Sequence, residues 1–275
     1  MDFDFNRISS PFRMQPGLAR LDAGANHLTR LDPGCALYRE KRSVSRSGAA
    51  HQCVEGFDPS NAVRTIWSNA RSTLQFPEDA PPDIELAFEE DFALLDATTG
   101  TIPWMCVCVP SHWAPEDKLG KSIAAIHAPV AGNADLQRAL SRLTSMVCQG
   151  GHWERFVWTI SPSPHYDQHP RRQARGAWPS TNSPGQFVAG CHFRAERQTF
   201  MPVHDAAGTP LKQAVFTIRV MLEPLVHVVR TREQALRLHE ALHSMSAEVL
   251  AYKHLALARG PLLAWLSSWV DRADR

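Results

Sequence analysis

The sequence lacks the cysteine and glycine patterns by which a chain holds an electron carrier of its own. Its six cysteines include no C-x-x-C pair, so the usual spacing for structural zinc or an iron–sulfur cluster is missing. Cys106 and Cys108 share one face of an expected strand, a placement unsuited to a disulfide, and we interpret all six as buried or surface thiols. No G-x-G-x-x-G fingerprint of a dinucleotide-binding fold is present either.

Three other absences narrow the class of protein. No apolar run reaches ~18 residues, so we expect no membrane span. The formal charge is only +1 and no long basic run occurs, which argues against nucleic acid as a partner. The first residues, MDFDFN, lack the charged-then-apolar order of a secretion signal, so we expect a cytoplasmic protein. An apolar content of 44% is typical of a folded globular chain.

The hydrophobic periodicity that is present predicts an α+β fold with an antiparallel sheet and packed helices. Expected helices cover 60–75, about 115–128, 135–148, 231 to about 252, and a last apolar segment at 261–270. Expected strands cover 90–96, 104–109, 153–160, 190–201 and 214–222, the first two forming a hairpin. We expect an N-terminal arm over 1–60, one domain with a C-terminal helical segment over 61–275, and a long surface loop over 161–185.

One metal motif is present on the expected C-terminal helix. His239-Glu240-Ala241-Leu242-His243 fits H-E-x-x-H, in which two histidines one turn apart bind zinc and the glutamate acts as base. The usual downstream third ligand is missing, and His254 lies well past the helix face. A zinc peptidase is therefore the third choice, and a surface helix is the preferred interpretation.

The most informative stretch runs from Val109 to Val130. It places His112 at the exit of an apolar strand and His127 on the short helix that follows. An imidazole in either place is a candidate axial ligand for a haem iron. The plain alternative for His127 is a core histidine bonded to a backbone carbonyl.

Several segments, in order along the chain, resemble the haem-dependent oxidative N-demethylase α-subunit family. The matching segments are Pro11-Phe12-Arg13-Met14, Glu90-Asp91-Phe92-Ala93-Leu94-Leu95, Pro110-Ser111-His112-Trp113, Lys118-Leu119-Gly120, Ile126-His127, Pro129-Val130, Glu196-Arg197-Gln198-Thr199, Phe216-Thr217-Ile218-Arg219 and Tyr252-Lys253. The chain departs from the family at Phe200-Met201-Pro202-Val203, at Val157 and in the basic loop 171–186. Those departures leave room for a different amine substrate.

The resemblance implies a PAS-like fold that holds haem b and oxidises an amine with dioxygen. Electrons are then expected from NADPH through a separate flavin and iron–sulfur reductase, because this chain holds no second carrier. His127 is the expected iron ligand, with His112 as the alternative ligand and a catalytic candidate. The alternative from another class is a haem-binding PAS-type sensor without turnover, although no output module is visible in the sequence.

Five further residues complete the expected site. Lys118, Arg197 and Arg219 are candidate partners of the haem propionates, since a guanidinium pairs a carboxylate in bidentate fashion. A structural ion pair on a strand is the alternative for Arg219. Trp113 either stacks on the macrocycle or packs under the hairpin. Glu223 is the expected carboxylate for a protonated amine, and burial would raise its pKa so that it also accepts a proton; an exposed strand-end charge is the alternative.

Overall fold

The structure, a computed structural model, describes residues 3–15, 17–22, 24–74, 76, 83–130 and 134–271. In that part of the chain one seven-stranded sheet forms the centre, with the strand order β1-β5-β6-β7-β3-β4-β2 and every neighbouring pair antiparallel. The strands are β1 (Ala19–Arg20), β2 (His51–Cys53), β3 (Glu90–Asp96), β4 (Thr101–Cys106), β5 (Trp153–Ser161), β6 (His192–His204) and β7 (Pro210–Pro224). The predicted α+β class and the antiparallel sheet are confirmed, whereas the likeness to a PAS fold stays a prediction.

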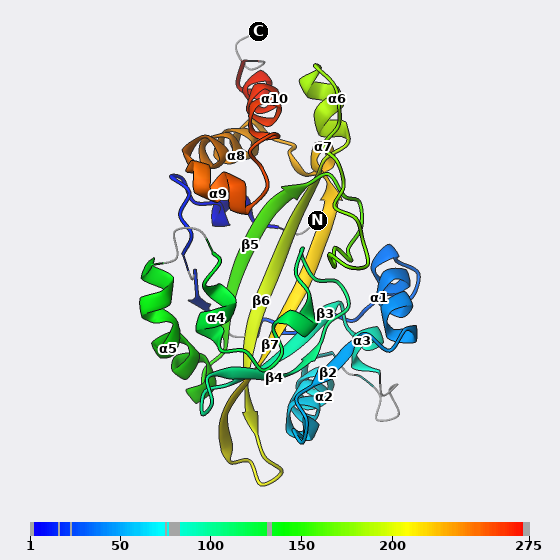
Figure 1. The fold of residues 1–275 in the computed structure, drawn as a ribbon, viewed down its shortest axis with the longest axis vertical. Helices are drawn as coiled ribbons and strands as arrows, with labels where there is room; N and C mark the ends of the chain where they lie inside the picture. The colour runs from blue at the N-terminus through cyan, green and yellow to red at the C-terminus, as the bar shows by residue number, and fades with distance from the viewer. Residues whose placement is uncertain are drawn as a thin grey trace.

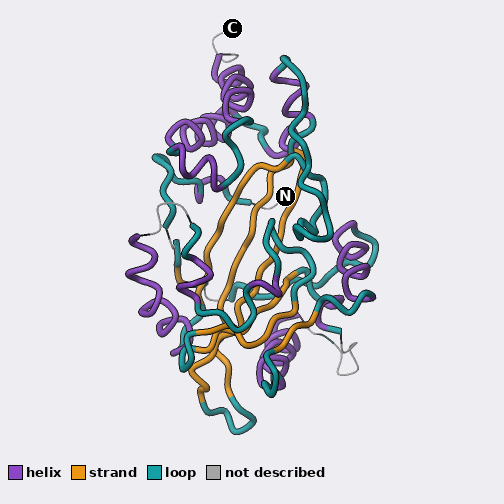
Figure 2. The backbone as a smooth tube through the Cα atoms, in the orientation of Figure 1, coloured by secondary structure: helices purple, strands orange, loops and turns teal. Residues whose placement is uncertain are grey.

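Helices surround the sheet on several sides (Figures 1 and 2). They are α1 (Ala36–Arg46), α2 (Ser60–Leu74), α3 (Ile84–Ala87), α4 (Ile123–His127), α5 (Ala134–Gln149), α6 (Pro184–Ala189), α7 (Leu225–Val228), α8 (Arg232–Ser244), α9 (Ala247–Tyr252) and α10 (Arg259–Asp271), with short 3₁₀ turns η1 (Phe5–Arg7) and η2 (Pro115–Asp117). Helices α6 to α10 gather at one end of the long strands β5 to β7, where they share one apolar core with Trp158 and Phe193. Within the described residues no helix has the length and apolarity needed to cross a membrane.

The alternation of side chains along β3 explains how two layers form against one strand. Successive strand residues point to opposite faces. Phe92 and Leu94 therefore pack with Ile66 of α2, while Ala93 and Leu95 face the opposite side, where α4 and α5 lie. The second of these layers contains the pocket described below.

Two predicted helices are interrupted in the structure. The segment expected to be one helix over 115–128 forms η2 and then α4, because the chain turns at Gly120, where φ is +71° and glycine is favoured. The helix expected from 231 to about 252 ends at Ser244, and α9 begins after the new N-cap Ser246. The loop before α6 also differs from a plain surface loop, since Asp167, Gln168 and other polar residues in it are buried.

Residues 1–60 contribute to the same sheet as the rest of the chain. Strand β1 pairs with β5, and β2 pairs with β4, so this segment supplies the two edge strands of the described sheet. Helix α1 is attached to β3 by the buried side chain of Lys41, which donates to the backbone carbonyls of Phe88, Glu89 and Glu90. The N-terminal segment is thus built into the fold through both backbone and side-chain bonds.

Candidate functional site: a pocket between the sheet and two helices

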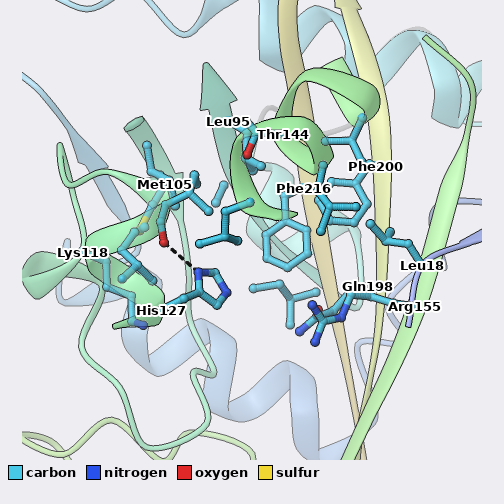
Figure 3. Close-up of a pocket in the computed structure, with 18 of the residues that line it drawn as sticks. Leu18, Leu95, Met105, Lys118, His127, Thr144, Arg155, Gln198, Phe200 and Phe216 are labelled. Atoms are coloured by element: carbon cyan, nitrogen blue, oxygen red, sulfur yellow. Dashed lines mark hydrogen bonds between the residues drawn. The ribbon is translucent and has the colours of Figure 1, made fainter. Parts of the chain in front are cut away.

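A pocket lies between α4, α5 and one face of the sheet (Figure 3). Its cavity volume is about 220 Å³. The walls are mostly apolar. They are formed by Leu18, Ala93, Leu95, Ile102, Met105, Trp113, Ile123, Ile126, Leu140, Leu143, Val147, Phe200, Phe216 and Ile218, with Lys118, His127, Thr144, Arg155, Glu196 and Gln198 as the polar members. Cofactor and substrate sites commonly combine apolar walls with a few converging polar groups.

His127 enters this pocket from the last turn of α4. The helix begins at Ser122, whose side chain accepts a hydrogen bond from the Ala125 amide. The Nδ1 of His127 lies 2.8 Å from the carbonyl oxygen of Ile123, one turn earlier, as the dashed line in Figure 3 shows. Because a carbonyl only accepts, Nδ1 carries the proton in this bond. Burial lowers the pKa of His127, so the ring is neutral and its Nε2 bears the lone pair.

That arrangement is the one that metal-binding histidines adopt. A ligating imidazole commonly donates its other ring nitrogen to a carbonyl or carboxylate, which fixes both the tautomer and the ring orientation. The backbone bond foreseen for a core histidine is therefore present, and it is made by Nδ1. Its presence is compatible with a ligand role for His127 and prepares the ring for it.

The polar end of the pocket holds more positive than negative charge. Lys118 and Arg155 line the pocket and Lys253 lies near Arg155; all three residues are half-buried, and for each of them Glu196 is the leading opposite charge. Burial lowers the pKa of all three, that of Lys253 to about 8. The Nε of Arg155 is a buried donor without a hydrogen-bond acceptor among the described residues. Since unpaired buried charge is costly, this end of the pocket favours an anionic ligand.

Glu196 is held in place by hydrogen bonds on both carboxylate oxygens. Its Oε1 accepts a very short bond from Ser111, and its Oε2 lies 2.6 Å from Nε2 of Gln198. Ser111 in turn accepts a 2.7 Å bond from Nε of the buried Arg194. The carboxylate thus has a defined position on the pocket wall beside Arg155.

The structure brings three of the residues expected from the sequence to this pocket. His127, Lys118 and Trp113 all line it, and Nζ of Lys118 lies 5.0 Å from the centre of the Trp113 ring. This spacing is that of a cation–π contact. Trp113 therefore packs with a cation at the pocket wall and also contributes to the apolar layer under the hairpin.

Arg197 and Arg219 are not brought to the pocket. On β6 the residues that line it are Glu196, Gln198 and Phe200, so the intervening Arg197 points to the opposite face. There its Nε lies 3.1 Å from Glu154, and Nε of Arg219 lies 2.6 Å from Glu89. Both arginines form structural ion pairs, which is the alternative foreseen for Arg219.

Glu223 and His112 also lie outside the lining of the pocket. Glu223 follows the lining residue Ile218 by five positions on β7, roughly 17 Å along the strand, and the strand alternation turns it to the other face. His112 lies in the left-handed region, with φ of 59°. Burial, with Arg175 and Arg194 nearby, lowers its pKa to about 4. Neither residue shares the pocket with His127.

Arg155 and Glu196 are the site residues that sequence reasoning did not select. Glu196 stands in the same Glu-Arg-Gln-Thr segment as Arg197, but three consecutive polar residues hide which one points inward. Side chains alternate between the two faces of a strand, so Glu196 lies on the same face of the sheet as the apolar pocket residue Phe200, and Arg155 lies on that face too.

The H-E-x-x-H motif on α8 forms no comparable site. The rings of His239 and His243 stack with their centres 6.1 Å apart, and Nε2 of His239 lies 3.2 Å from the hydroxyl of Ser267. Over the described ranges no third His, Cys, Asp or Glu completes a metal site with this pair. The surface-helix interpretation is therefore the one that fits the structure.

Comparison with known protein families gives one match, over residues 61–263, which is more than half of the chain. The matching family is described as haem-dependent oxidative N-demethylase, alpha subunit-like. The chain belongs to this family. No curated protein matches the chain. The matched range of the N-demethylase-like family contains every polar member of the pocket.

The pocket residues fit the haem that the name of this family implies. A haem site needs a ligand for the iron, apolar walls for the macrocycle and cations for the two propionates. His127 has the tautomer of a ligand, the walls are mostly apolar, and Lys118 and Arg155 supply cations, the Nε of Arg155 having no acceptor among the described residues.

Proposed function

We propose that this protein is a haem-dependent oxygenase that oxidises an amine, by oxidative N-demethylation or a closely related reaction. The observation that carries the proposal is the half-buried, neutral His127 in a mostly apolar pocket whose polar lining includes the cations Lys118 and Arg155. Membership in the N-demethylase-like family supports the same conclusion. When bound, haem b would supply the activation of dioxygen and the oxidation of the carbon next to the amine nitrogen.

In this proposal His127 would hold the haem iron through its ring nitrogen Nε2. The bond from Nδ1 to the Ile123 carbonyl keeps the ring neutral and correctly oriented, so no proton has to be removed before the ligand bond forms. The apolar residues that line the pocket would keep water away from the bound group. Low local polarity also strengthens every electrostatic interaction inside the pocket.

Lys118 and Arg155 take the role of propionate partners. Three half-buried cations share the Glu196 carboxylate, so two propionate charges would come close to balancing the group. Lys253 donates instead to the Trp158 carbonyl at 2.7 Å and lies against the rings of Phe12 and Trp158. Its charge therefore contributes through the field rather than through direct contact.

Glu196 takes the role first expected of Glu223. A secondary or tertiary amine is protonated at neutral pH and needs a carboxylate or an aromatic face when it leaves water. Glu196 is the carboxylate on the pocket wall, with Phe200 and Phe216 as aromatic neighbours. It would bind the ammonium group and hold the amine in place beside the oxidising site.

Electrons must reach the site from outside this chain. We propose NADPH as their source and a separate flavin and iron–sulfur protein as the carrier, with a cytoplasmic location for the pair. The six free cysteines, four of them buried and none in a C-x-x-C pair, support a separate carrier. The product would be a carbinolamine that separates into the dealkylated amine and an aldehyde.

The test is turnover of the haem-loaded protein with a surrogate reductase, NADPH and a panel of N-methylated amines. The proposal predicts that aldehyde release and NADPH oxidation rise together when a suitable amine is added. Tight haem binding with no amine-dependent aldehyde from any member of the panel would contradict the proposed reaction. That result would favour the haem-binding sensor in its place.

A further inference from the structure

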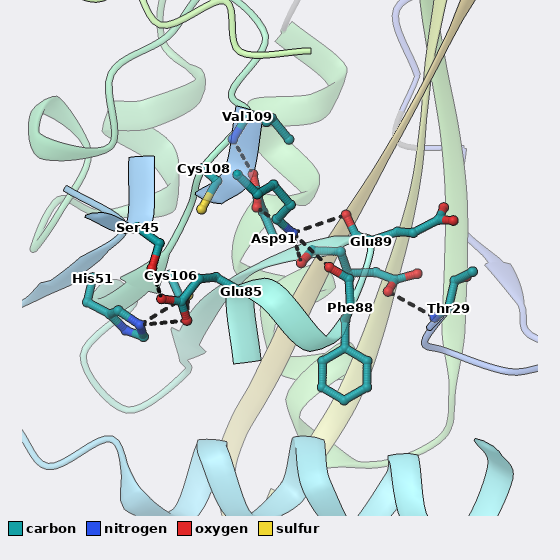
Figure 4. A network of polar contacts seen from close by, with 12 residues as sticks. Thr29, Ser45, His51, Glu85, Phe88, Glu89, Asp91, Cys106, Cys108 and Val109 are labelled. Atoms are coloured by element: carbon teal, nitrogen blue, oxygen red, sulfur yellow. Dashed lines mark hydrogen bonds and ion pairs between the residues drawn. The ribbon is translucent and has the colours of Figure 1, made fainter. Parts of the chain in front are cut away.

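A second group of ligand-type side chains lies on the other face of the strand that lines the haem pocket (Figure 4). His51 of β2 and Cys106 of β4 are direct partners across the antiparallel pair, and Glu85 of α3 covers them. The Nε2 of His51 lies 3.0 Å from Oε2 of Glu85 and 3.7 Å from Sγ of Cys106. Sγ and Oε2 are 3.9 Å apart.

These separations are close to those of a tetrahedral metal site. Zinc bonds of about 2.0–2.3 Å at tetrahedral angles place a nitrogen and an oxygen ligand about 3.3 Å apart, and place sulfur about 3.6 Å from either. The observed separations of 3.0, 3.7 and 3.9 Å differ from these values by only a few tenths of an ångström. A small shift of side chains therefore brings all three ligand atoms onto one ion.

The surroundings of the group also suit a metal ligand set. Ser45 donates to the other carboxylate oxygen of Glu85 at 2.8 Å, which orients Oε2 toward His51 and Cys106. Burial on its own would raise the pKa of Glu85, but the bonds from His51 and Ser45 lower it to about 2, so the carboxylate is charged. The His51 side chain is 50% exposed, which leaves a route from solvent.

We propose that His51, Glu85 and Cys106 bind one Zn²⁺ ion, with water as the fourth ligand. Mixed nitrogen, sulfur and carboxylate ligands select a borderline ion such as zinc over magnesium or calcium. Binding requires a deprotonated Cys106 thiol and a neutral His51, so affinity falls as pH falls. The ion would tie β2 and α3 to β4, whose Met105 lines the haem pocket on the opposite face. This site is independent of the proposed haem chemistry.

The test is equilibrium dialysis of the chelator-treated, haem-loaded protein against Zn²⁺, followed by elemental analysis of zinc and iron in the same sample. We expect one equivalent of zinc in the wild-type protein. Cys106→Ser and His51→Gln should each weaken zinc binding by more than about a hundredfold, beyond the ~10–100-fold typical of removing a group that only supports a ligand. The iron content reports separately on the haem site, and circular dichroism shows that each variant is folded.

Two matched controls make the assignment specific. Cys53→Ser changes an exposed thiol on the same strand as His51, and His243→Asn removes one histidine of the α8 pair. Both controls should keep the full equivalent of zinc. Absence of saturable zinc in the wild-type protein, retention of zinc by Cys106→Ser or His51→Gln in folded form, or its loss in His243→Asn would each overturn the proposal.

Discussion

Replacement of Lys41 by methionine tests how the N-terminal segment is attached to the sheet. The Lys41 ammonium group is fully buried, lies 3.1 Å from Oδ1 of Asp91, and donates to three consecutive carbonyls at 2.7–3.2 Å. Burial alone would lower the pKa of Lys41, but the Asp91 charge and hydrogen bond raise it, so the residue is charged. Lys41→Met keeps the length of the apolar stem and leaves the buried Asp91 carboxylate without its cation.

Removal of one partner of a buried ion pair typically costs about 3–5 kcal/mol, because the other charge stays buried and uncompensated. At ~2–4 °C per kcal/mol for a chain of roughly this size, the melting temperature of Lys41→Met should fall by roughly 6–20 °C. Urea unfolding followed by circular dichroism measures the free energy directly.

The double variant Lys41→Met/Asp91→Asn provides the control. Asparagine at position 91 keeps an acceptor for the Val109 amide, which now donates to Asp91 Oδ2 at 2.7 Å, and it removes the uncompensated charge. The double variant should therefore be more stable than Lys41→Met alone. A cost below about 1 kcal/mol for Lys41→Met, or equal stability of the single and double variants, would refute this reasoning.

Three other predictions concern the pocket and the pH dependence of stability. Arg155→Met should speed haem loss roughly 10–100-fold, as expected when a charge-assisted hydrogen bond is removed. The rate of haem transfer to apomyoglobin measures the loss, and Arg197→Met, on the opposite face of the sheet, should leave that rate unchanged. Glu196→Gln should lower kcat/KM for the amine by at least ~100-fold while haem stays bound, whereas an equal effect of Glu223→Gln would contradict the assignment. Burial, with help from His152 and Arg197, lowers the pKa of His27 from 6.5 to about 3. Between these pH values the unfolded chain binds a proton that the folded chain does not, so the free energy of unfolding falls as pH drops below 6.5, by up to ~1.4 kcal/mol per pH unit. His27→Gln should remove this contribution, which urea unfolding at pH 7 and pH 5 measures.

Local patterns were sufficient to predict the main elements. The 3.6-residue spacing of Val63, Ile66 and Ala70 predicts α2, and the structure places that helix at Ser60–Leu74. The β3–β4 hairpin was predicted from two apolar runs joined at Gly100, whose φ of 69° suits the turn. Such features depend on residues close together in the sequence.

Features that depend on distant residues could not be predicted in this way. The edge strand Ala19–Arg20 has only two residues, and its pairing with β5 is set by tertiary contacts. The inward face of β6 is hidden because Glu196, Arg197 and Gln198 are all polar, so Arg197 was expected at the pocket and Glu196 was not. His127 was identified because it lies within a short, distinctive segment, whereas Arg155 depends on where β5 lies in the sheet.

The most direct test of the central claim compares the absorption spectra of His127→Ala and His112→Ala after haem reconstitution. We expect His112→Ala to keep the intense Soret band of a histidine-ligated haem, whereas His127→Ala should lose the band or shift it. Imidazole added to His127→Ala should restore the band. An unchanged spectrum in His127→Ala, or loss of the band in His112→Ala alone, would contradict the assignment of His127 as the iron ligand.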